Sequence, residues 1–195
     1  MPVGSRQGLA GKRIALIGGE QSDAVARVLQ DAGATVERLT EAANGDARWH
    51  SAMHAALVVV EGLPDSLEER AVQLIRECLL ADKPVAAHGG AVALLLTSGG
   101  VAGRAIAADA SMDAMLSPAG ATAAREPLHD DGGILTARAT VPIAEFAREV
   151  VSRIGERLLD RQVDEMSDLS FPASDPPATT SASVGHVAPD RETRA

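Results

Sequence analysis

Short apolar runs alternate with amphipathic stretches along the first half of the chain. Four of these runs are bounded by polar residues or glycine and predict buried strands. They lie at residues 14–17, 34–39, 56–60 and 84–87. Apolar residues recur every three or four positions from Val25 to Ala32 and from Leu67 to Cys78, which predicts two helices. Strands and helices that alternate in this way are typical of βαβ units, so we expect an α/β fold with a mainly parallel sheet.

The pattern changes after residue 120. Strand-like runs at residues 121–128 and 134–139 flank an Asp-Gly pair, Asp131 and Gly132, which predicts a β-hairpin. We expect a last helix to begin near Pro142, because proline suits the first turn of a helix. The apolar face of this helix comprises Phe146, Val150, Ile154 and Leu158.

Ser66 and Glu69 stand three residues apart, just before the apolar stripe of the second helix. This spacing predicts a capping box, in which the Ser66 side chain caps the helix and Glu69 bonds back to it.

The chain divides into one domain and two flanking segments. Residues 1–11 are polar and glycine-rich and are expected to be flexible, and residues 12–162 form the domain. Residues 163–195 are rich in Pro, Ser, Thr and Ala. They hold too few large apolar residues to offset the entropy of ordering, so we expect a disordered tail.

The charge and composition of the chain limit the partners and the cellular compartment that we expect. The chain has 27 acidic and 18 basic residues and a net charge of -9, which opposes binding to nucleic acid. No run approaches the roughly 20 apolar residues of a membrane span. The single cysteine, Cys78, allows no disulfide within the chain. These features favour a cytoplasmic protein that binds neither nucleic acid nor membrane.

In their order and spacing, these pieces resemble the ThiJ/PfpI family over roughly residues 12–160. The segments that carry the resemblance are residues 56–60 (ALVVV), 83–87 (KPVAA), 94–95 (LL), 100–104 (GVAGR), 119–122 (AGAT) and 131–138 (DGGILTAR). The resemblance implies a flavodoxin-like three-layer sandwich of the class I glutamine-amidotransferase type, and it also implies a homo-oligomer. The family includes intracellular proteases, glyoxalase-like and deglycase-like enzymes, chaperones and domains without known activity.

The family's reactive cysteine is missing from this chain. In the family, the strand that resembles residues 84–87 leads into a tight turn with the motif Ile-Cys-His-Gly, where the cysteine is an exposed nucleophile. Here the same strand is followed by His88, Gly89 and Gly90, which places Gly89 at the cysteine position in an alignment without gaps. Glycine has no side chain that could attack a substrate, so we expect no catalytic residues of the family type.

Four residues are candidate ligand contacts: Glu20, His88, Gly89 and Gly90. Glu20 follows the first strand and is the position that the resemblance suggests for the family's acidic residue. His88 ends a parallel strand, where ligands usually bind in open α/β sheets. Gly89 and Gly90 leave backbone N–H groups at the start of a helix, which can accept an anion. The alternatives are a histidine packed against the sheet and a plain tight turn.

No metal or cofactor is expected. His50 and His54 are four residues apart, but no third ligand with suitable spacing is evident. The Gly18-Gly19-Glu20 turn lacks the spacing of a dinucleotide-binding loop, and the chain has no tyrosine for dehydrogenase chemistry. Cys78 lies on the apolar stripe of a helix, so we expect it to be buried and inert.

Three functions are compatible with these observations. The first is a pseudoenzyme that binds a small molecule or anion, or supports an oligomer. The second is a cysteine-independent hydrolase or glyoxalase-like enzyme, with His88 as general base and Glu20 as its partner. The third is a protein–protein interaction module that uses the tail as an arm.

Overall fold

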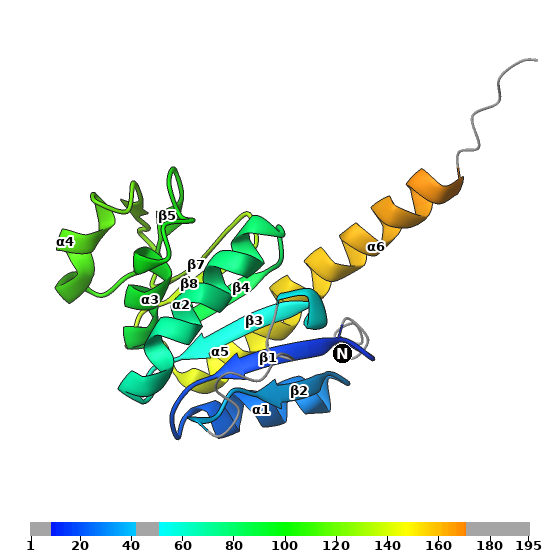
Figure 1. Ribbon diagram of the computed structural model, residues 1–195, viewed down its shortest axis with the longest axis horizontal. Coiled ribbons are helices and arrows are strands. Elements are labelled where there is room, and N and C mark those ends of the chain that lie inside the picture. Colours follow the sequence, from blue (N-terminus) through cyan, green and yellow to red (C-terminus); the bar gives the residue numbers. More distant parts are fainter. Residues whose placement is uncertain (1–8, 42–50, 171–195) are drawn as a thin grey trace, which may run out of the picture.

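The computed structural model describes residues 9–41 and 51–170, with side chains as far as residue 164. Its main sheet has the strand order β2-β1-β3-β4-β8-β7 (Figure 1). The six strands are β1 (Arg13–Ile17), β2 (Thr35–Arg38), β3 (Ala56–Val60), β4 (Val85–His88), β7 (Leu128–Asp131) and β8 (Ile134–Ala137). Every neighbouring pair is parallel except β7 and β8. The predicted mainly parallel sheet and the later hairpin are both confirmed.

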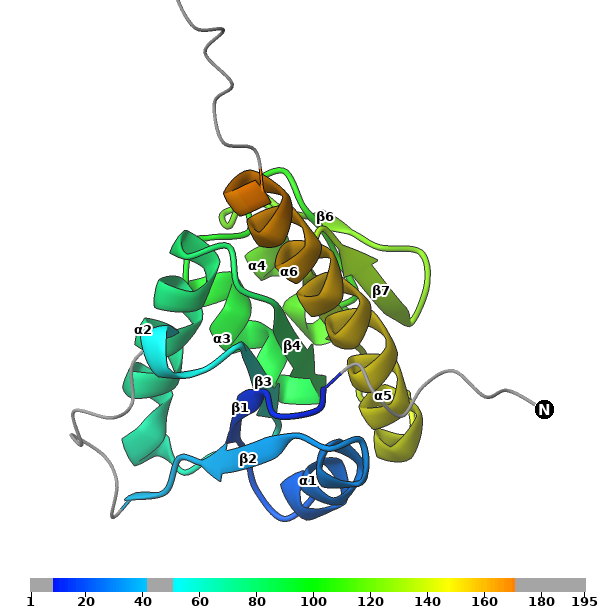
Figure 2. The same cartoon turned by 90° about the vertical axis from the view of Figure 1, so that its right-hand side faces the viewer.

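Helices cover both faces of this sheet. The α-helices are α1 (Ser22–Asp31), α2 (Asp65–Leu80), α3 (Val92–Thr97), α4 (Asp113–Leu116), α5 (Ile143–Glu149) and α6 (Gly155–Ser170). Short 3-10 helices are η2 (Ser51–Met53), η3 (Gly89–Ala91) and η4 (Ala110–Met112), and the π-helical turn η5 (Val150–Ile154) joins α5 to α6. Figure 2 shows α2 and α3 on one side of the sheet and α1 and α5 on the other. This arrangement confirms the flavodoxin-like three-layer sandwich.

Strand β3 runs through the centre of the molecule, and all five of its residues are buried. Leu57 and Val59 pack into the core under α2 and α3, whereas Val58 and Val60 pack into the core under α1 and α5. A strand buried on both faces has an uninterrupted apolar sequence, which is why residues 56–60 show no alternation. Each fully buried aliphatic side chain of this kind stabilises the fold by about 1.5–3 kcal/mol relative to an exposed one.

The β7–β8 hairpin turns at Gly132 and Gly133, whose φ angles of 61° and 89° suit glycine. Asp131 pairs with Ile134 across this two-residue turn. Only the end of the predicted run at residues 121–128 belongs to the hairpin. A short strand within it, β6 (Thr122–Ala123), pairs instead with β5 (Ala105–Ile106) in a separate two-stranded sheet.

The start of one helix differs from the sequence prediction. The predicted capping box is wrong: α2 begins at Asp65, Pro64 precedes it without a side-chain cap, and the Ser66 hydroxyl donates to Glu41. Pro64 has an extended backbone, so the preceding loop ends at this residue and the helix begins directly after it. Helix α6 continues to Ser170, past residue 162, where the sequence suggested the end of the domain. Of the flexible segment expected at residues 1–11, residues 1–8 lie outside the described residues, and Leu9 is fully buried. Of the disordered tail expected at residues 163–195, residues 171–195 lie outside the described residues.

Across residues 9–41 and 51–170, no helix combines the length and apolar character that a transmembrane segment requires.

Candidate functional site

Three loops meet at the carboxyl edge of the sheet. They follow β1, β3 and β4, which are neighbours in the sheet and run in the same direction. Ligands usually bind at this edge in open α/β proteins. Here the loops after β1 and β3 line a shallow pocket of about 440 Å³, formed by Glu20, Gln21, Glu61 and Gly62. We refer to it as the carboxyl-edge pocket.

Close contact between two of these loops depends on glycine. A Cβ atom on Gly19 would lie 2.5 Å from the Gly62 carbonyl oxygen. The Gly19 N–H donates to the Glu61 carbonyl at 3.1 Å. A side chain at position 19 would force the loops apart, so Gly19 allows the contact that holds Glu61 next to Glu20.

The Glu61 carboxylate fills the space beside Gly89. Gly89 has a φ of 60°, and a Cβ atom built on it would overlap the Oε2 atom of Glu61. The same oxygen accepts a hydrogen bond from the Gly90 N–H at 3.1 Å, and Oε1 lies 3.5 Å from the Gln21 amide nitrogen. Glu61 therefore occupies the volume that a side chain at position 89 would take, and it engages the N–H group expected to receive an anion.

His88 lies away from this pocket, on the α5 side of the sheet. Its side chain is buried, and its ring centroid is 5.1 Å from that of Phe146. The Nε2 atom donates to the Val141 carbonyl oxygen at 2.8 Å, so Nε2 carries the ring proton. Within the described residues, Nδ1 has no hydrogen-bond partner. His88 thus ties β4 to the segment before α5.

The four residues singled out from the sequence are only partly brought together. Glu20 lines the carboxyl-edge pocket, and Gly89 and Gly90 adjoin Glu61 behind it. His88 is not among the pocket-lining residues. Glu61 was not predicted from the sequence, although a charged residue directly after a fully buried parallel strand was a usable signal.

Two further residues considered from the sequence, Cys78 and His54, are buried. Cys78 is 2% exposed, and burial raises its pKa to about 11, with the Lys83 charge opposing and the Glu77 charge adding to the shift. A thiol in this state is a poor nucleophile. The ring of His54 is buried, with Nε2 3.0 Å from a Glu37 carboxylate oxygen.

A metal site finds no support in the part of the chain that the structure describes. In residues 9–41 and 51–170, no group of three or more His, Cys, Asp or Glu side chains is placed to hold a metal ion. His50, the other member of the histidine pair, lies outside the described residues.

Comparison with known proteins agrees with the fold. Residues 46–153 match the family model described as the DJ-1/PfpI family. A ThiJ/PfpI domain protein from Brachyspira murdochii superposes with a TM-score of 0.61 at 15% identity, over 76% of this chain and 98% of that one. Drosophila melanogaster DJ-1beta gives a TM-score of 0.57 at 16% identity, over 80% and 98%. No curated protein sequence is significantly similar to this chain.

A larger relative contains this fold as one of its parts. The two-domain protein from Anabaena variabilis, which has DJ-1/ThiJ/PfpI-like and ferritin-like domains, gives a TM-score of 0.64 at 21% identity. The match covers 74% of this chain but only half of that protein. At these identities the likeness establishes the fold alone.

Proposed function

Because this chain belongs to the DJ-1/PfpI family, we propose that it is a member that binds a small ligand without the family's cysteine chemistry. The position of Glu61 is the observation that supports this proposal most. Its carboxylate lies where a side chain at position 89 would project, and the resemblance assigns position 89 to the family cysteine. A carboxylate bound to a backbone N–H is suited to hold a ligand by charge and hydrogen bonds.

The lining of the carboxyl-edge pocket favours a ligand that donates hydrogen bonds. Two carboxylates, Glu20 and Glu61, line the pocket, and among the described residues no basic side chain does. The Gly90 N–H is already engaged by Glu61 and is not available to an anion. We therefore favour a small amine or guanidine over the anion that the sequence suggested. A guanidinium group could pair with Glu61 through two parallel hydrogen bonds.

Amide spectra of isotopically labelled protein test this proposal, with ethylguanidinium chloride and sodium acetate as probes. Ethylguanidinium should shift the Gly62 and Gly90 resonances in a saturable manner, and acetate should not. Glu61→Gln should weaken the response to ethylguanidinium roughly tenfold, because one charge of the pair is lost. Glu69→Gln, an exposed position on α2, makes the same charge change away from the pocket. Equal responses to the two salts would refute a donor-binding site.

A cysteine-independent enzyme is the second candidate, and Glu61 is the observation that favours it. A carboxylate fixed by the Gly90 N–H could act as a general base. The base expected from the sequence, His88, is buried and bonded to the Val141 carbonyl. Methylglyoxal turnover that disappears in Glu61→Gln but persists in Glu69→Gln would establish an enzyme. We expect no turnover by either the native protein or the variants.

Assembly into a homo-oligomer stays a prediction from the family resemblance. Leu159 and Val163 are 48% and 62% exposed on α6 and are four residues apart, so they share a helix face that a partner could cover. Light scattering over a range of protein concentrations measures the oligomeric state. An interaction role for the tail stays untested, since residues 171–195 lie outside the described part of the chain.

A further inference from the structure

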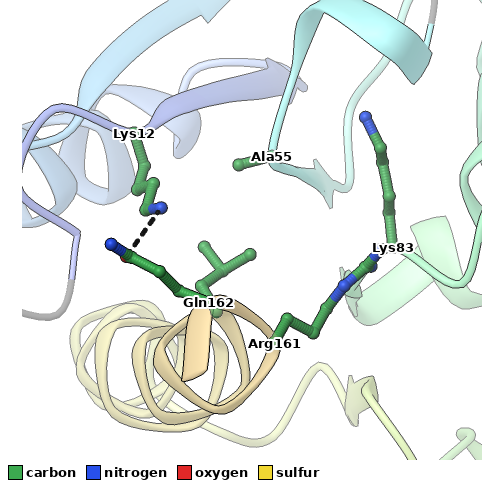
Figure 3. A pocket seen from close by; sticks show the side chains of 6 residues that line it. Lys12, Ala55, Lys83, Arg161 and Gln162 are labelled. Atoms are coloured by element: carbon green, nitrogen blue, oxygen red, sulfur yellow. Dashed lines mark hydrogen bonds between the residues drawn. The ribbon is translucent and has the colours of Figure 1, made fainter. Parts of the chain in front are cut away.

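A second hollow lies at the opposite edge of the sheet, where the strands begin. Lys12, Ala55 and Lys83 lie just before β1, β3 and β4, and Leu158, Arg161 and Gln162 come from α6. These six residues enclose about 410 Å³ (Figure 3). We name this hollow the basal pocket. It shares no residue with the carboxyl-edge pocket.

Three cations line the basal pocket of a strongly acidic protein. Lys12, Lys83 and Arg161 come from three separate segments, and each is half-buried. Within the described part of the chain, none of the three forms a salt bridge. The nearby Asp82 carboxylate is 3.4 Å from Arg157 and is itself exposed. Half-buried positive charges without counter-ions are costly, and an anion would relieve that cost.

The three cations use only some of their N–H groups in hydrogen bonds to the protein. Lys83 donates to the carbonyls of Ser51 and His54, and Arg161 donates to the Asp82 carbonyl at 2.6 Å. Lys12 contacts the Gln162 side-chain oxygen at 3.4 Å. An ammonium has three N–H groups and a guanidinium has five, so each cation retains donors for a ligand.

The electrostatic environment of Lys83 is consistent with a pocket that binds an anion. Burial lowers the pKa of Lys83, and the charge of Arg161 lowers it further, while Cys78 acts in the opposite direction. The two cations are therefore close enough to repel each other, and a bound anion would offset the repulsion.

The positions of the charges indicate the shape of the ligand. Figure 3 shows Lys12 and Gln162 on one side of the hollow, and Lys83 and Arg161 on the other, with Ala55 between them. Leu158 adds a second apolar surface to the lining. We propose that the basal pocket binds a small organic dianion, with one anionic group near Lys12, the other near Arg161 and Lys83, and a short neutral middle over Ala55 and Leu158. The anionic groups are carboxylates or phosphates, which make the same contacts with these cations.

Calorimetric titration with three probes at constant ionic strength tests this assignment. Glutarate carries two separated carboxylates, pyrophosphate carries two phosphates, and butyrate carries one carboxylate. At least one of the dianions should bind roughly tenfold more tightly than butyrate, because it engages both sides of the pocket. Preference for glutarate or for pyrophosphate would show which anionic group the site takes.

Two variants and a matched control locate the binding. Lys12→Gln and Arg161→Gln should each weaken dianion binding about fivefold or more, because each removes one charged contact. Arg125→Gln removes a charge from an exposed residue outside the pocket lining and should leave the affinity within about twofold. Lys83 is left unchanged because its ammonium supports the backbone at residues 51–54. Thermal unfolding followed by circular dichroism confirms that each variant is folded.

Three results would overturn the proposal. They are the absence of binding by both dianions, equal binding of butyrate, and affinities that Lys12→Gln and Arg161→Gln leave unchanged. None of these results bears on the carboxyl-edge pocket, whose residues and probes are different.

Discussion

At the scale of single residues, Gly89 and Glu61 account for the character of the carboxyl-edge pocket. The backbone at Gly89 keeps a left-handed turn, with φ at 60°, but the space beside it contains a carboxylate from the loop that follows β3. In the function that we propose, this carboxylate takes the space that a side chain at position 89 would fill. Under that proposal the turn at Gly89 presents a fixed negative charge where the family resemblance places a nucleophile.

Gly89→Ala tests whether this space is filled. We expect it to lower the free energy of unfolding by about 2–4 kcal/mol, because a left-handed alanine is strained and its Cβ displaces Glu61. Gly99→Ala is the matched control, since Gly99 also has a positive φ but no atom lies within 4 Å of the place that its Cβ would take. It should cost only about 1–2 kcal/mol of backbone strain.

A double variant, measured by urea denaturation, separates the cost of backbone strain at position 89 from the cost of displacing Glu61. Adding Glu61→Ala to Gly89→Ala should recover part of the lost stability, because it removes the atoms that the new Cβ meets. If Gly89→Ala costs no more than Gly99→Ala, the carboxylate does not occupy the space assigned to it.

Cys78 is expected to be silent in thiol assays of the folded protein. With a pKa of about 11, only about one thiol in a thousand is ionised at pH 8, and the side chain is also buried. A disulfide reagent such as dithiobisnitrobenzoate should therefore react slowly with native protein and rapidly with protein unfolded in about 8 M urea. Rapid reaction of the native protein at pH 8 would mean that α2 opens or that the thiol is accessible.

At the scale of elements, Asp131 joins the hairpin to the small β5–β6 sheet. Its carboxylate accepts a hydrogen bond from the Ala105 N–H at 2.7 Å and another from Arg104 at 3.1 Å. The Ala105 bond lowers the pKa of Asp131 most, and the Arg104 hydrogen bond and charge lower it further, while partial burial opposes them. Since the folded pKa lies below the unfolded one, this stabilisation is complete above the ordinary pKa of aspartate and is lost as the pH falls through the folded value.

Asp131→Asn should lower the free energy of unfolding by about 1–2 kcal/mol at pH 7, because two bonds to a charged acceptor are weakened. The difference from the native protein should shrink as the pH falls below about 4, where Asp131 of the unfolded chain takes up a proton, and it should vanish once the pH passes the lower pKa of the folded protein. Urea unfolding at pH values from 7 to about 2.5 measures the difference in the free energy of unfolding between Asp131→Asn and the native protein. Asp31→Asn, at the exposed end of α1, controls for net charge. A difference that stays constant with pH would show that the charge of Asp131 plays no part.

The elements were largely predictable from sequence where burial determines the pattern. Residues 56–60 form a strand because both faces of the sheet are covered, and Asp131-Gly132 is a hairpin signal that needs no tertiary contact. The start of α2 was not predictable from the capping rule, since Pro64 ends the preceding loop and the Ser66 hydroxyl bonds to Glu41, 25 residues away. Short strands such as β5 and β6 form only because the fold brings two distant loops together.

The candidate site was less predictable than the fold. The positions of Glu20, Gly89 and Gly90 after strands were enough to predict that they lie at the carboxyl edge of the sheet. Which way His88 points depends on the pleat of β4, and which side chain fills the space at Gly89 depends on how β3 and β4 pair. The direction of His88 and the side chain beside Gly89 both depend on contacts across the sheet, so the residues near position 89 do not predict them.

At the scale of the whole molecule, one sheet supports two pockets of opposite charge. Glu20 and Glu61 line the pocket at the carboxyl edge, and Lys12, Lys83 and Arg161 line the basal pocket at the amino edge. Helix α6 completes the basal pocket and then extends away from the body of the protein, as Figure 1 shows. The same scaffold therefore separates two pockets of opposite charge, for which we propose different ligands.

A crystal structure of the protein soaked with ethylguanidinium chloride tests the central claim most directly. Our account predicts the guanidinium paired with Glu61 in the carboxyl-edge pocket, while Glu61 Oε2 keeps its hydrogen bond to the Gly90 N–H and fills the space beside Gly89. The account would be contradicted if Glu61 were turned away from Gly89 and an anion were bound to the Gly90 N–H in its place.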